Sequence, residues 1–439
     1  MNVNLFAALS SGPKKGAQLR QYLGVSQPTL SRLTSAARNS GRIGVLGRGR
    51  STRYALLRSN RGLGPEVPVH RVSASGAVQH IGTLITLEPT RFWFTEAKPR
   101  GGGKEIAGLP WFMLDLRPTG FVAAQLTSQW PDLSLPERAE DWTSDQALLA
   151  MARRGEDMPG DLLIGEESLA RWLAPPAVSV IKPALALLRY VERVTELLAG
   201  RSANCWLGGE QPKFCAVVGN DDASARRVIV KFSGLRTAPA GKRWANLLLA
   251  EHLASEVLRE QGRTSVVTAF YQNERRAFLE IQRFDRVGLH GRQGAVSLRA
   301  LQASLPVAPQ GPLEATAGLL RSQRISNEDA REIRWRAAFC ALIGNGVLRS
   351  DDVSFFNAAC GTLRLAPTYD MLPMIYAPLG DDLPAREFLP PSPLPACADQ
   401  WRAALPAAIS FWQRFGQDAR ATLDMRVMAR ENAARLQTF

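Results

Sequence analysis

Cysteine and histidine are scarce in this chain of 439 residues, which has five cysteines and four histidines. No two cysteines stand in a CxxC spacing, so no zinc-binding pattern can be assembled. No uncharged apolar run approaches the ~18 residues of a membrane span. The first residues, MNVNLFAALSSGPKK, lack the charged-then-apolar order of a signal peptide. These absences favour a reduced, cytoplasmic protein with no membrane segment.

Acidic residues are also fewer than basic ones. The chain has 40 Asp plus Glu against 54 Lys plus Arg, a formal charge of +14. Such an excess suits nucleic-acid phosphates or simply aids solubility, and charge alone does not choose between these roles. The length predicts two or three domains with ample buried area.

The first sixty residues have the spacing of a helix-turn-helix. Residues 4–10, 14–23 and 28–40 are expected to form short amphipathic helices, with Ser26 as the N-cap of the third. Gly24 can adopt the positive φ that the preceding turn needs. The next run, RIGVLGRGRSTRYALL, predicts two strands around a tip rich in Gly and Arg.

This segment, about residues 4–58, resembles the winged helix-turn-helix domains of bacterial regulators. The third helix would then contact base edges, and the arginine-rich tip would contact phosphate or the minor groove of duplex DNA. The alternative is a small helical domain used for dimerisation, with its basic residues as a solvated face. The candidate DNA-binding residues are Gln27, Thr29, Ser31, Arg32, Arg48, Arg50 and Arg53.

A linker rich in Gly and Pro, SNRGLGPEVPVH, follows at residues 59–70 and places a domain boundary near residue 62. The alternating GTLITLEPTRFWF then predicts strands of a new domain. Farther on, Lys231 lies in the strand-like VIVKF, where alternation turns its ammonium away from the apolar face. A lysine so placed can bridge nucleotide phosphates, or be a solvated strand lysine. Glu251, in a predicted helix, is a candidate partner.

The stretch IGNGVLRSDDVSFF, residues 343–356, follows a predicted helix whose N-cap is Ser326, with Asp329 completing a capping box. The later segment LAPTYDMLP brings a second acidic group, Asp370. Carboxylates on adjacent loops are what magnesium and a triphosphate require. This pattern predicts a phosphate-transfer site.

Over about residues 70–430 these segments, in this order, resemble the HipA family of bacterial serine/threonine kinase toxins, and the fused N-terminal domain resembles its YjjJ (HipH) type members. The resemblance is carried by LPWFMLDLRPTGF, GGEQPKF, VIVKF, LAEHLASEV, IQRFDR, IGNG with VSFF, and LAPTYDMLP. It implies binding of ATP and Mg²⁺. The implied phosphate-side residues are Gly208, Gly209, Gln211 and Lys213, the nucleotide lysine and its partner are Lys231 and Glu251, and Gln282 and Phe284 flank the adenine.

The chain departs from the family at the catalytic loop, which the family writes approximately as GNxDxHxxNxS. Val347 stands at the catalytic aspartate, Arg349 at the histidine, and Asp352 at the metal-binding asparagine. Valine cannot accept a proton, whereas Asp352 and Asp370 can still ligate magnesium. Asp351 is a candidate substitute base, and Arg349 can stabilise developing negative charge. Trp206 occupies the position of the family's self-phosphorylated serine.

The expected fold is α+β: a winged helix-turn-helix over 1–62, a HipA-like N-terminal subdomain over 63–200, a nucleotide-binding lobe over 201–290 and a helical lobe over 291–439, the last two forming a protein-kinase-like pair.

The expected function is a serine/threonine kinase toxin of a type II toxin-antitoxin system, acting on a protein substrate, with an antitoxin as partner and weak or lost transfer. One alternative is a pseudokinase regulator that binds DNA and senses nucleotide or docks a partner. Another is a DNA-binding regulator whose large domain only forms a homodimer.

Overall fold

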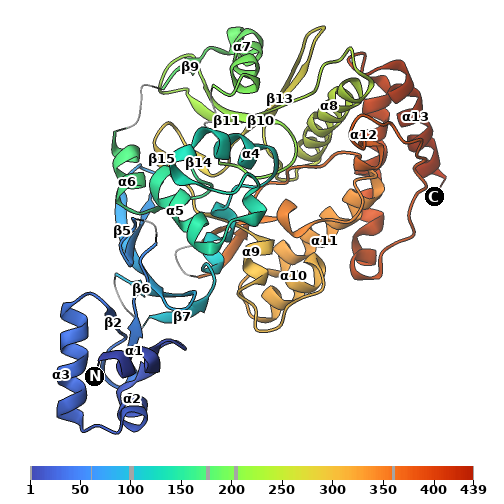
Figure 1. Cartoon of the computed structure of the whole chain (residues 1–439). Helices are drawn as coiled ribbons and strands as arrows, with labels where there is room; N and C mark the ends of the chain where they lie inside the picture. Colours follow the sequence, from blue (N-terminus) through green and yellow to red (C-terminus); the bar gives the residue numbers. More distant parts are fainter. Residues whose placement is uncertain are drawn as a thin grey trace.

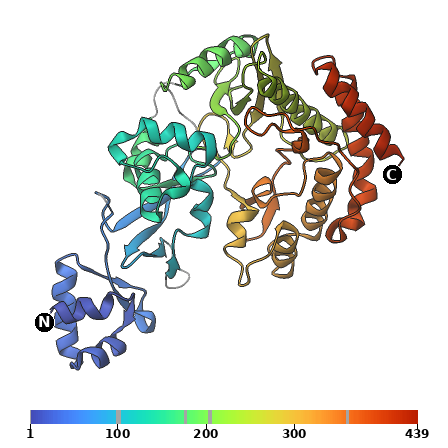
Figure 2. The same cartoon turned by 45° about the vertical axis from the view of Figure 1, so that its right-hand side comes forward.

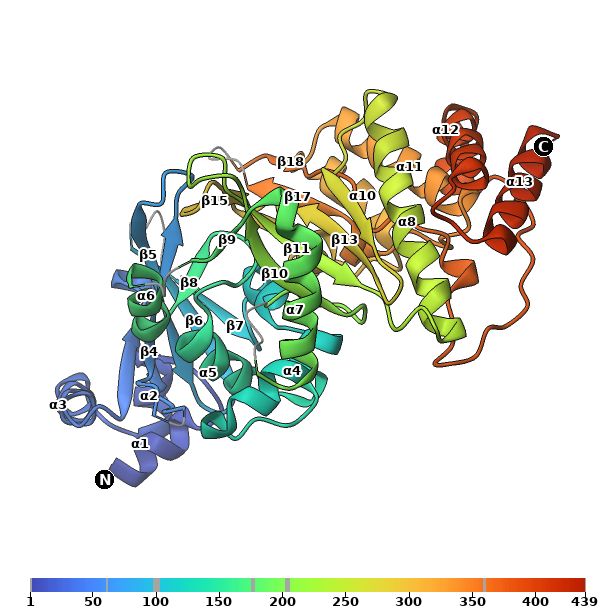
Figure 3. The ribbon, with the colours of Figure 1, turned by 90° about the horizontal axis from the view of Figure 1, so that it is seen from above.

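The computed structural model describes residues 2–60, 62–97, 103–174, 178–201, 206–357 and 361–438. Met1 and Arg61, from two segments quoted above, and two of the five cysteines, Cys205 and Cys360, lie outside these ranges. The N-terminal helices lie at one end of the molecule and the C-terminal helices at the other, with two sheets between them (Figures 1 and 3). The architecture is mixed α+β, as predicted. Within the described ranges, no helix is both long and apolar enough to cross a membrane.

The N-terminal domain has the three predicted helices and the two predicted strands, but Lys14 and Lys15, predicted to begin the second helix, form a short strand instead. Its helices are α1 (Asn2–Leu9), α2 (Gly16–Leu23) and α3 (Gln27–Asn39), and its sheet has the order β1-β3-β2, with β1 (Lys14–Lys15), β2 (Ile43–Leu46) and β3 (Arg53–Leu56). Ser26 caps α3 by accepting a hydrogen bond from the Thr29 N–H at 3.4 Å. Gly24 has φ 64°, as the turn requires. Leu5, Leu19 and Leu30 form the core.

The segment predicted as a linker is instead a packed junction, and its second part belongs to a strand, β4 (Glu66–Val72). The chain leaving β3 pairs with the next sheet through a bridge between Leu57 and Leu87. Arg58 forms an ion pair with Asp145. Gly and Pro are frequent both in packed turns and in exposed linkers, so residue composition does not distinguish the two.

The middle domain is an antiparallel sheet of order β7-β6-β5-β4-β8 covered by helices. Val67, Leu84 and Phe92 of the sheet pack against Leu148 and Ile164 in one buried cluster. The other strands are β5 (Val78–Leu87), β6 (Arg91–Glu96), β7 (Lys104–Ala107) and β8 (Leu162–Ile164). The helices are α4 (Gly120–Gln129), α5 (Ser144–Arg154) and α6 (Glu166–Leu173), with short 3-10 segments η2 (Trp111–Leu116), η3 (Pro131–Leu133) and η4 (Ala139–Asp141).

The lobe predicted to bind nucleotide, which we call the nucleotide lobe after that prediction, has a sheet of order β12-β13-β11-β10-β9. Alternation turns Val228, Val230 and Phe232 toward α7, where Tyr190 packs on them. The opposite face carries Ile229 and Lys231. The strands are β9 (Val180–Ile181), β10 (Lys213–Val218), β11 (Arg226–Phe232), β12 (Thr268–Gln272) and β13 (Ala277–Gln282), and the helices are α7 (Ala186–Leu198), which follows η5 (Pro183–Leu185), and α8 (Pro239–Glu260).

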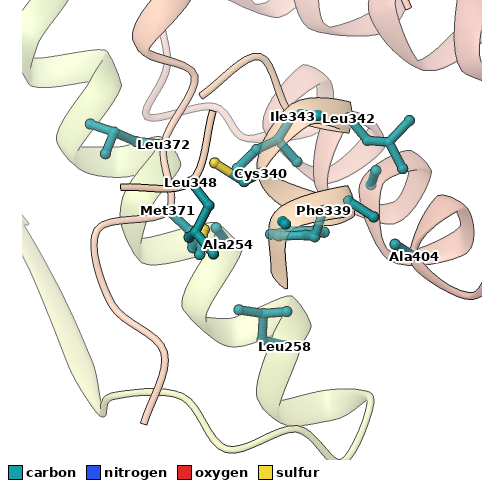
Figure 4. Close-up of a cluster of buried hydrophobic side chains, with 14 of the residues drawn as sticks. Ala254, Leu258, Phe339, Cys340, Leu342, Ile343, Leu348, Met371, Leu372 and Ala404 are labelled. Atoms are coloured by element: carbon teal, nitrogen blue, oxygen red, sulfur yellow. The ribbon is translucent and has the colours of Figure 1, made fainter. Parts of the chain in front are cut away.

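The last part is mainly helical, and its core continues into the nucleotide lobe. Ala254 and Leu258 of α8 face Phe339 and Cys340 of α11 (Figure 4). The helices are α9 (Leu298–Gln302), α10 (Pro312–Arg321), α11 (Asn327–Leu342), α12 (Ala398–Gln417) and α13 (Leu423–Gln437). The strands are β14 (Arg286–Val287), β15 (Gly291–Arg292), β16 (Ala295–Ser297), β17 (Ser354–Asn357) and β18 (Leu363–Leu365), and the 3-10 segments are η6 (Ser350–Asp352), η7 (Met374–Tyr376) and η8 (Pro395–Cys397).

Candidate nucleotide site

Lys231 lies at the centre of the candidate site. Its ammonium, on β11, donates to both carboxylate oxygens of Glu251 on α8, at 2.7 and 2.9 Å. The same ammonium contacts Oδ1 of Asp370. Lys231 and Glu251 are buried, whereas the Asp370 side chain is 40% exposed. The predicted pair is therefore present, and Asp370 joins it from a separate segment.

Asp370 is held in an unusual backbone conformation. Its φ is 57°, in the left-handed region that non-glycine residues seldom adopt. The side-chain amide of Asn345 donates to the Asp370 carbonyl at 3.1 Å. Strained residues of this kind persist where their surroundings fix them, which is common at functional sites. The contact also links the Asp370 segment to the start of the catalytic loop.

The charges of this cluster depend on one another. Burial opposes the charge of Lys231, but Asp370 and Glu251 outweigh it and raise the pKa of the ammonium above its usual value. Burial would raise the pKa of Asp370, but Lys231 and Lys213 lower it to about 2. Burial raises the pKa of Glu251 to about 7, against the attraction of Lys231. The more exposed carboxylate, Asp370, therefore stays ionised and available to a cation.

The predicted phosphate-side loop lies next to Lys231, because the first residue of β10, Lys213, pairs in register with Lys231. The Lys213 ammonium donates to the Gly208 carbonyl at 2.6 Å. Gly209 has φ 114°, a backbone conformation that favours glycine. Gln211 is half-buried between the loop and the strand.

Trp206, just before this loop, is buried in the middle domain. Its indole N–H donates to the Arg154 carbonyl at 2.8 Å, and its ring lies 5.5 Å from that of Trp130. A side chain without a hydroxyl in this buried position cannot be a phosphorylation site. The residue instead anchors the loop to the middle domain.

The predicted adenine-side residues follow β13. The Phe284 ring stacks on Tyr369 with centroids 5.7 Å apart, and it meets Phe356 edge-on at 5.7 Å. Ile229 and Ile281 join the same apolar cluster, on the sheet face that carries Lys231. Gln282 is half-buried, and its N–H donates to the Val267 carbonyl at 2.9 Å. Aromatic and apolar side chains beside a lysine suit a base and its phosphates.

Asp352 and Asp370, the predicted magnesium ligands, approach each other from separate loops. Burial and the nearby Asp370 raise the pKa of Asp352 to about 7. A divalent cation relieves this repulsion, so the two carboxylates fit magnesium, which commonly takes one or two protein carboxylates plus phosphate and water oxygens. In the described part of the chain, no group of three or more His, Cys, Asp or Glu side chains is arranged to hold a metal.

The catalytic loop is anchored by Leu348, which packs near Met371 and Ala254 (Figure 4). Its neighbour Val347 is turned outward and is 72% exposed. The Arg349 side chain is 73% exposed and lies 3.8 Å from the Asp351 carboxylate. That carboxylate also accepts a hydrogen bond from Arg299 at 2.5 Å. The Asp351 carboxylate is therefore engaged by two guanidinium groups.

The candidate DNA-binding residues divide into two groups. Thr29 bonds to the Ser26 hydroxyl at 3.0 Å, and Arg53 is half-buried with its guanidinium 4.0 Å from Glu105, so both are partly engaged within the protein. The remaining candidates are exposed on α3 or on the tip between β2 and β3: Gln27, Ser31, Arg32, Arg48 and Arg50.

Sequence reasoning assigned no role to Asp115 and Thr119. Both side chains form hydrogen bonds to segments that hold the candidate site. They lie within LPWFMLDLRPTGF, a segment that carried the family resemblance, but its pattern does not indicate contact with residues far along the chain. Tyr369, next to Asp370, was also missed, although an aromatic residue beside a predicted metal ligand was a usable signal.

The arrangement of a small sheet, a helical lobe and a lysine–carboxylate cluster between them is that of a HipA-like fold. Solved HipA from Shewanella oneidensis MR-1, in a complex with HipB and operator DNA, superposes with a TM-score of 0.52 at 15% identity, covering 85% of this chain and 96% of HipA. The Helicobacter pylori proinflammatory kinase CtkA matches over 52% of this chain and 93% of its own, with a TM-score of 0.34 at 11% identity.

Sequence comparison defines the family more closely. The family model "YjjJ-like toxin, middle domain" matches residues 63–173, and "HipA-like C-terminal domain" matches residues 205–429. Toxin YjjJ from Escherichia coli (strain K12) is 31% identical over 433 residues, which are 96% of this chain and 95% of that protein. The chain belongs to the family of YjjJ-like toxins, within the HipA-like proteins.

Proposed function

We propose that the site around Lys231 binds ATP with Mg²⁺. The observation that carries this proposal is the buried ion pair of Lys231 and Glu251, with Asp370 on its exposed side. A buried lysine held by two carboxylates costs desolvation energy that a purely structural role does not require. The phosphates of a nucleoside triphosphate would bind the Lys231 ammonium, and its cation would bind the Asp370 carboxylate.

Each group has a role that follows from its place. Lys231 binds phosphate oxygens, and Glu251 fixes the direction of its ammonium. Phe284 and Tyr369 contact the base. Asp352 and Asp370 would hold Mg²⁺, which neutralises charge on the phosphates when bound. These residues bind and orient, which accounts for much of the rate enhancement in phosphoryl transfer.

Transfer to a serine or threonine of a protein is the slow step in this proposal. Val347 cannot accept the hydroxyl proton, and Asp351 is engaged by Arg299 and Arg349. Arg349 can stabilise charge on the transferred group, but its guanidinium stays protonated and cannot act as a base. The protein is thus a kinase toxin with weak transfer, or, as the second candidate, a nucleotide-sensing pseudokinase.

We also propose that the N-terminal domain binds duplex DNA as a winged helix-turn-helix. The supporting observation is the exposure of Arg48 and Arg50 on the tip between β2 and β3, together with exposed Gln27, Ser31 and Arg32 on α3. The solved HipA was in a complex with HipB and operator DNA. By analogy, an antitoxin of a type II system and operator DNA are the partners that we propose for this chain.

A nucleotide titration of the whole protein tests the first proposal. ATP or ADP with Mg²⁺ should raise the melting temperature, because a ligand that binds the native state stabilises it. Lys231→Ala should remove this shift. Lys242→Ala, at an exposed lysine of α8, is the matched control and should keep it. No shift at millimolar nucleotide for the natural sequence would reject nucleotide binding.

A further inference from the structure

One short segment of the middle domain touches both sides of the candidate site. We call residues Trp111–Phe121 the strut: it comprises η2, a turn and the start of α4. At its first end, Trp111 and Leu114 pack against the helical-lobe core. At its other end, Phe121 meets Phe232 of the nucleotide lobe, with ring centroids 6.0 Å apart. The strut therefore spans the two lobes.

Asp115 connects the strut to the catalytic loop. Its carboxylate accepts hydrogen bonds from the N–H and the hydroxyl of Ser297, at 2.7 and 2.6 Å, at the start of α9. It also lies 3.4 Å from the guanidinium of Arg299, which donates to Asp351. Asp115 thus fixes the helix end and the arginine that hold η6, the segment containing Asp351 and Asp352.

Thr119 connects the strut to the phosphate-side loop. Its hydroxyl accepts a hydrogen bond from the Gly209 N–H at 3.1 Å, and the Phe121 N–H donates to the Gly209 carbonyl at 3.2 Å. Gly120, between them, has φ 60°, and a Cβ there would lie 2.6 Å from the Gly209 carbonyl. The two backbones therefore approach as closely as glycine allows.

These contacts are more specific than attachment of the middle domain requires. Attachment is provided elsewhere by a buried ionic network, in which Arg283 pairs with Asp157 at 3.1 Å and with Asp285 at 2.9 Å, and Arg286 pairs with Asp157 at 2.7 Å. Arg117 of the strut bonds within the middle domain, to the Ala139 carbonyl, whereas the side chains of Asp115 and Thr119 bond to the segments that carry the two loops. The strut is thus placed to set the loops relative to each other.

We propose that Thr119 and Asp115 are positioning residues, which hold the phosphate-side loop and the catalytic loop in register so that one nucleotide can contact both. The positioning role rests on the proposed nucleotide function. The coupling of the two loops does not, because it is a property of the nucleotide-free protein. Because both loops bond to the strut, a change at the phosphate-side loop should alter the catalytic loop, and a change at the catalytic loop should alter the phosphate-side loop.

Hydrogen exchange of the nucleotide-free, full-length protein tests the coupling. Thr119→Val keeps the shape and removes the acceptor, so exchange should accelerate in residues 206–213 and also in 350–352. Asp115→Asn removes the charge and one acceptor, and it should accelerate exchange in both segments. Thr127→Val on α4, whose hydroxyl bonds only to the Ala123 carbonyl at 3.0 Å among its described contacts, is the control. Acceleration confined to each variant's own loop would overturn the coupling.

Nucleotide affinity then tests positioning. Thr119→Val should weaken ADP binding roughly three- to tenfold, the usual worth of one hydrogen bond that orders a loop, and Thr119→Ser should restore it. A purely structural role would lower the melting temperature of the valine variant and leave its Kd unchanged, which would overturn the proposal. Tighter binding would also overturn it, because the hydroxyl would then compete with phosphate. If the natural sequence binds no nucleotide, the proposed function fails, while the exchange result still decides the coupling.

Discussion

The nucleotide lobe and the catalytic loop, which face each other across the candidate site, differ in what they retain. On the lobe, Lys231 and Glu251 form a buried pair with well-defined geometry. On the loop, the exposed Val347 stands where the family resemblance predicts a catalytic aspartate. Binding and orientation need many groups in place, whereas proton acceptance needs only one. The loss of one group can therefore remove chemistry without disturbing the site that binds the substrate.

The largest expected effect comes from restoring the loop. Val347→Asp with Asp352→Asn recreates the family pattern, and an exposed position 347 tolerates the charge. Phosphorylation should rise by between about a hundredfold and ten-thousandfold, the usual contribution of a positioned acid or base. Radiolabel transfer from ATP, with the natural sequence and Asp351→Ala in parallel, measures it.

Two results would contradict this expectation. Vigorous labelling by the natural sequence, abolished by Asp351→Ala, would show that Asp351 acts as the base despite its contacts with arginine. No gain in the double variant, although it still binds nucleotide, would show that more than the aspartate has been lost. Either result would break the contrast between the two regions.

The sequence could predict the site residues that local patterns indicate, and it could not predict those whose partners are distant in the chain. Strand alternation predicted the direction of Lys231, and helix spacing offered Glu251, because both signals are local. Asp370 was proposed as a metal ligand because carboxylates on adjacent loops suit magnesium, and the family resemblance implied the same role. Thr119 and Asp115 were out of reach: their partners Gly209 and Ser297 lie 90 and 182 positions away in the chain. Contacts between distant loops depend on how whole domains pack.

The junction after the first sixty residues shows a similar limit. Gly and Pro predicted a linker there, and the structure shows that Arg58 and Asn60 both contact Asp145. The N-terminal domain, blue in Figure 2, is thus packed on the middle domain, where Leu46 and Ala55 share a buried cluster with Leu87 of β5 and Trp93 of β6. Its orientation relative to the candidate site is fixed by burial and ion pairing, neither of which residue composition reports.

An intermediate effect is expected from the arginine tip of the N-terminal domain. Replacing Arg48 and Arg50 by alanine should weaken binding to duplex DNA in general. It should also reduce the salt dependence by about 0.9 in log–log slope for each DNA phosphate that the variant no longer neutralises. Arg53→Ala should change the slope less, because Arg53 lies near Glu105. Fluorescence anisotropy at several salt concentrations measures both.

Equal slopes for the double variant and the natural protein would remove the tip from the proposed DNA interface. An effect of Arg53→Ala as large as that of the double variant would show that the ion pair opens on binding. Glutamine at both arginine positions is a useful second control, since it keeps polarity and length while removing charge.

The smallest effect near neutral pH is expected in the ionic network that joins the middle domain to the nucleotide lobe. Burial would raise the pKa of Asp157 and of Asp285, but Arg283 and Arg286 outweigh it and hold both values below the usual range. A carboxyl whose pKa is lower in the folded state stabilises it above the unfolded value of about 4, and this contribution is lost as pH falls below that value. The contribution of these two carboxyls to stability should therefore be constant between pH 6 and 8, and its loss should make the melting temperature fall steeply below pH 4. Asp157→Asn should lower the melting temperature at neutral pH and flatten the acid dependence, whereas Asp399→Asn, at an exposed pair with Arg334, should leave the acid dependence nearly unchanged. An acid profile that is identical in the Asp157 variant and the natural protein would show that other carboxylates control acid unfolding.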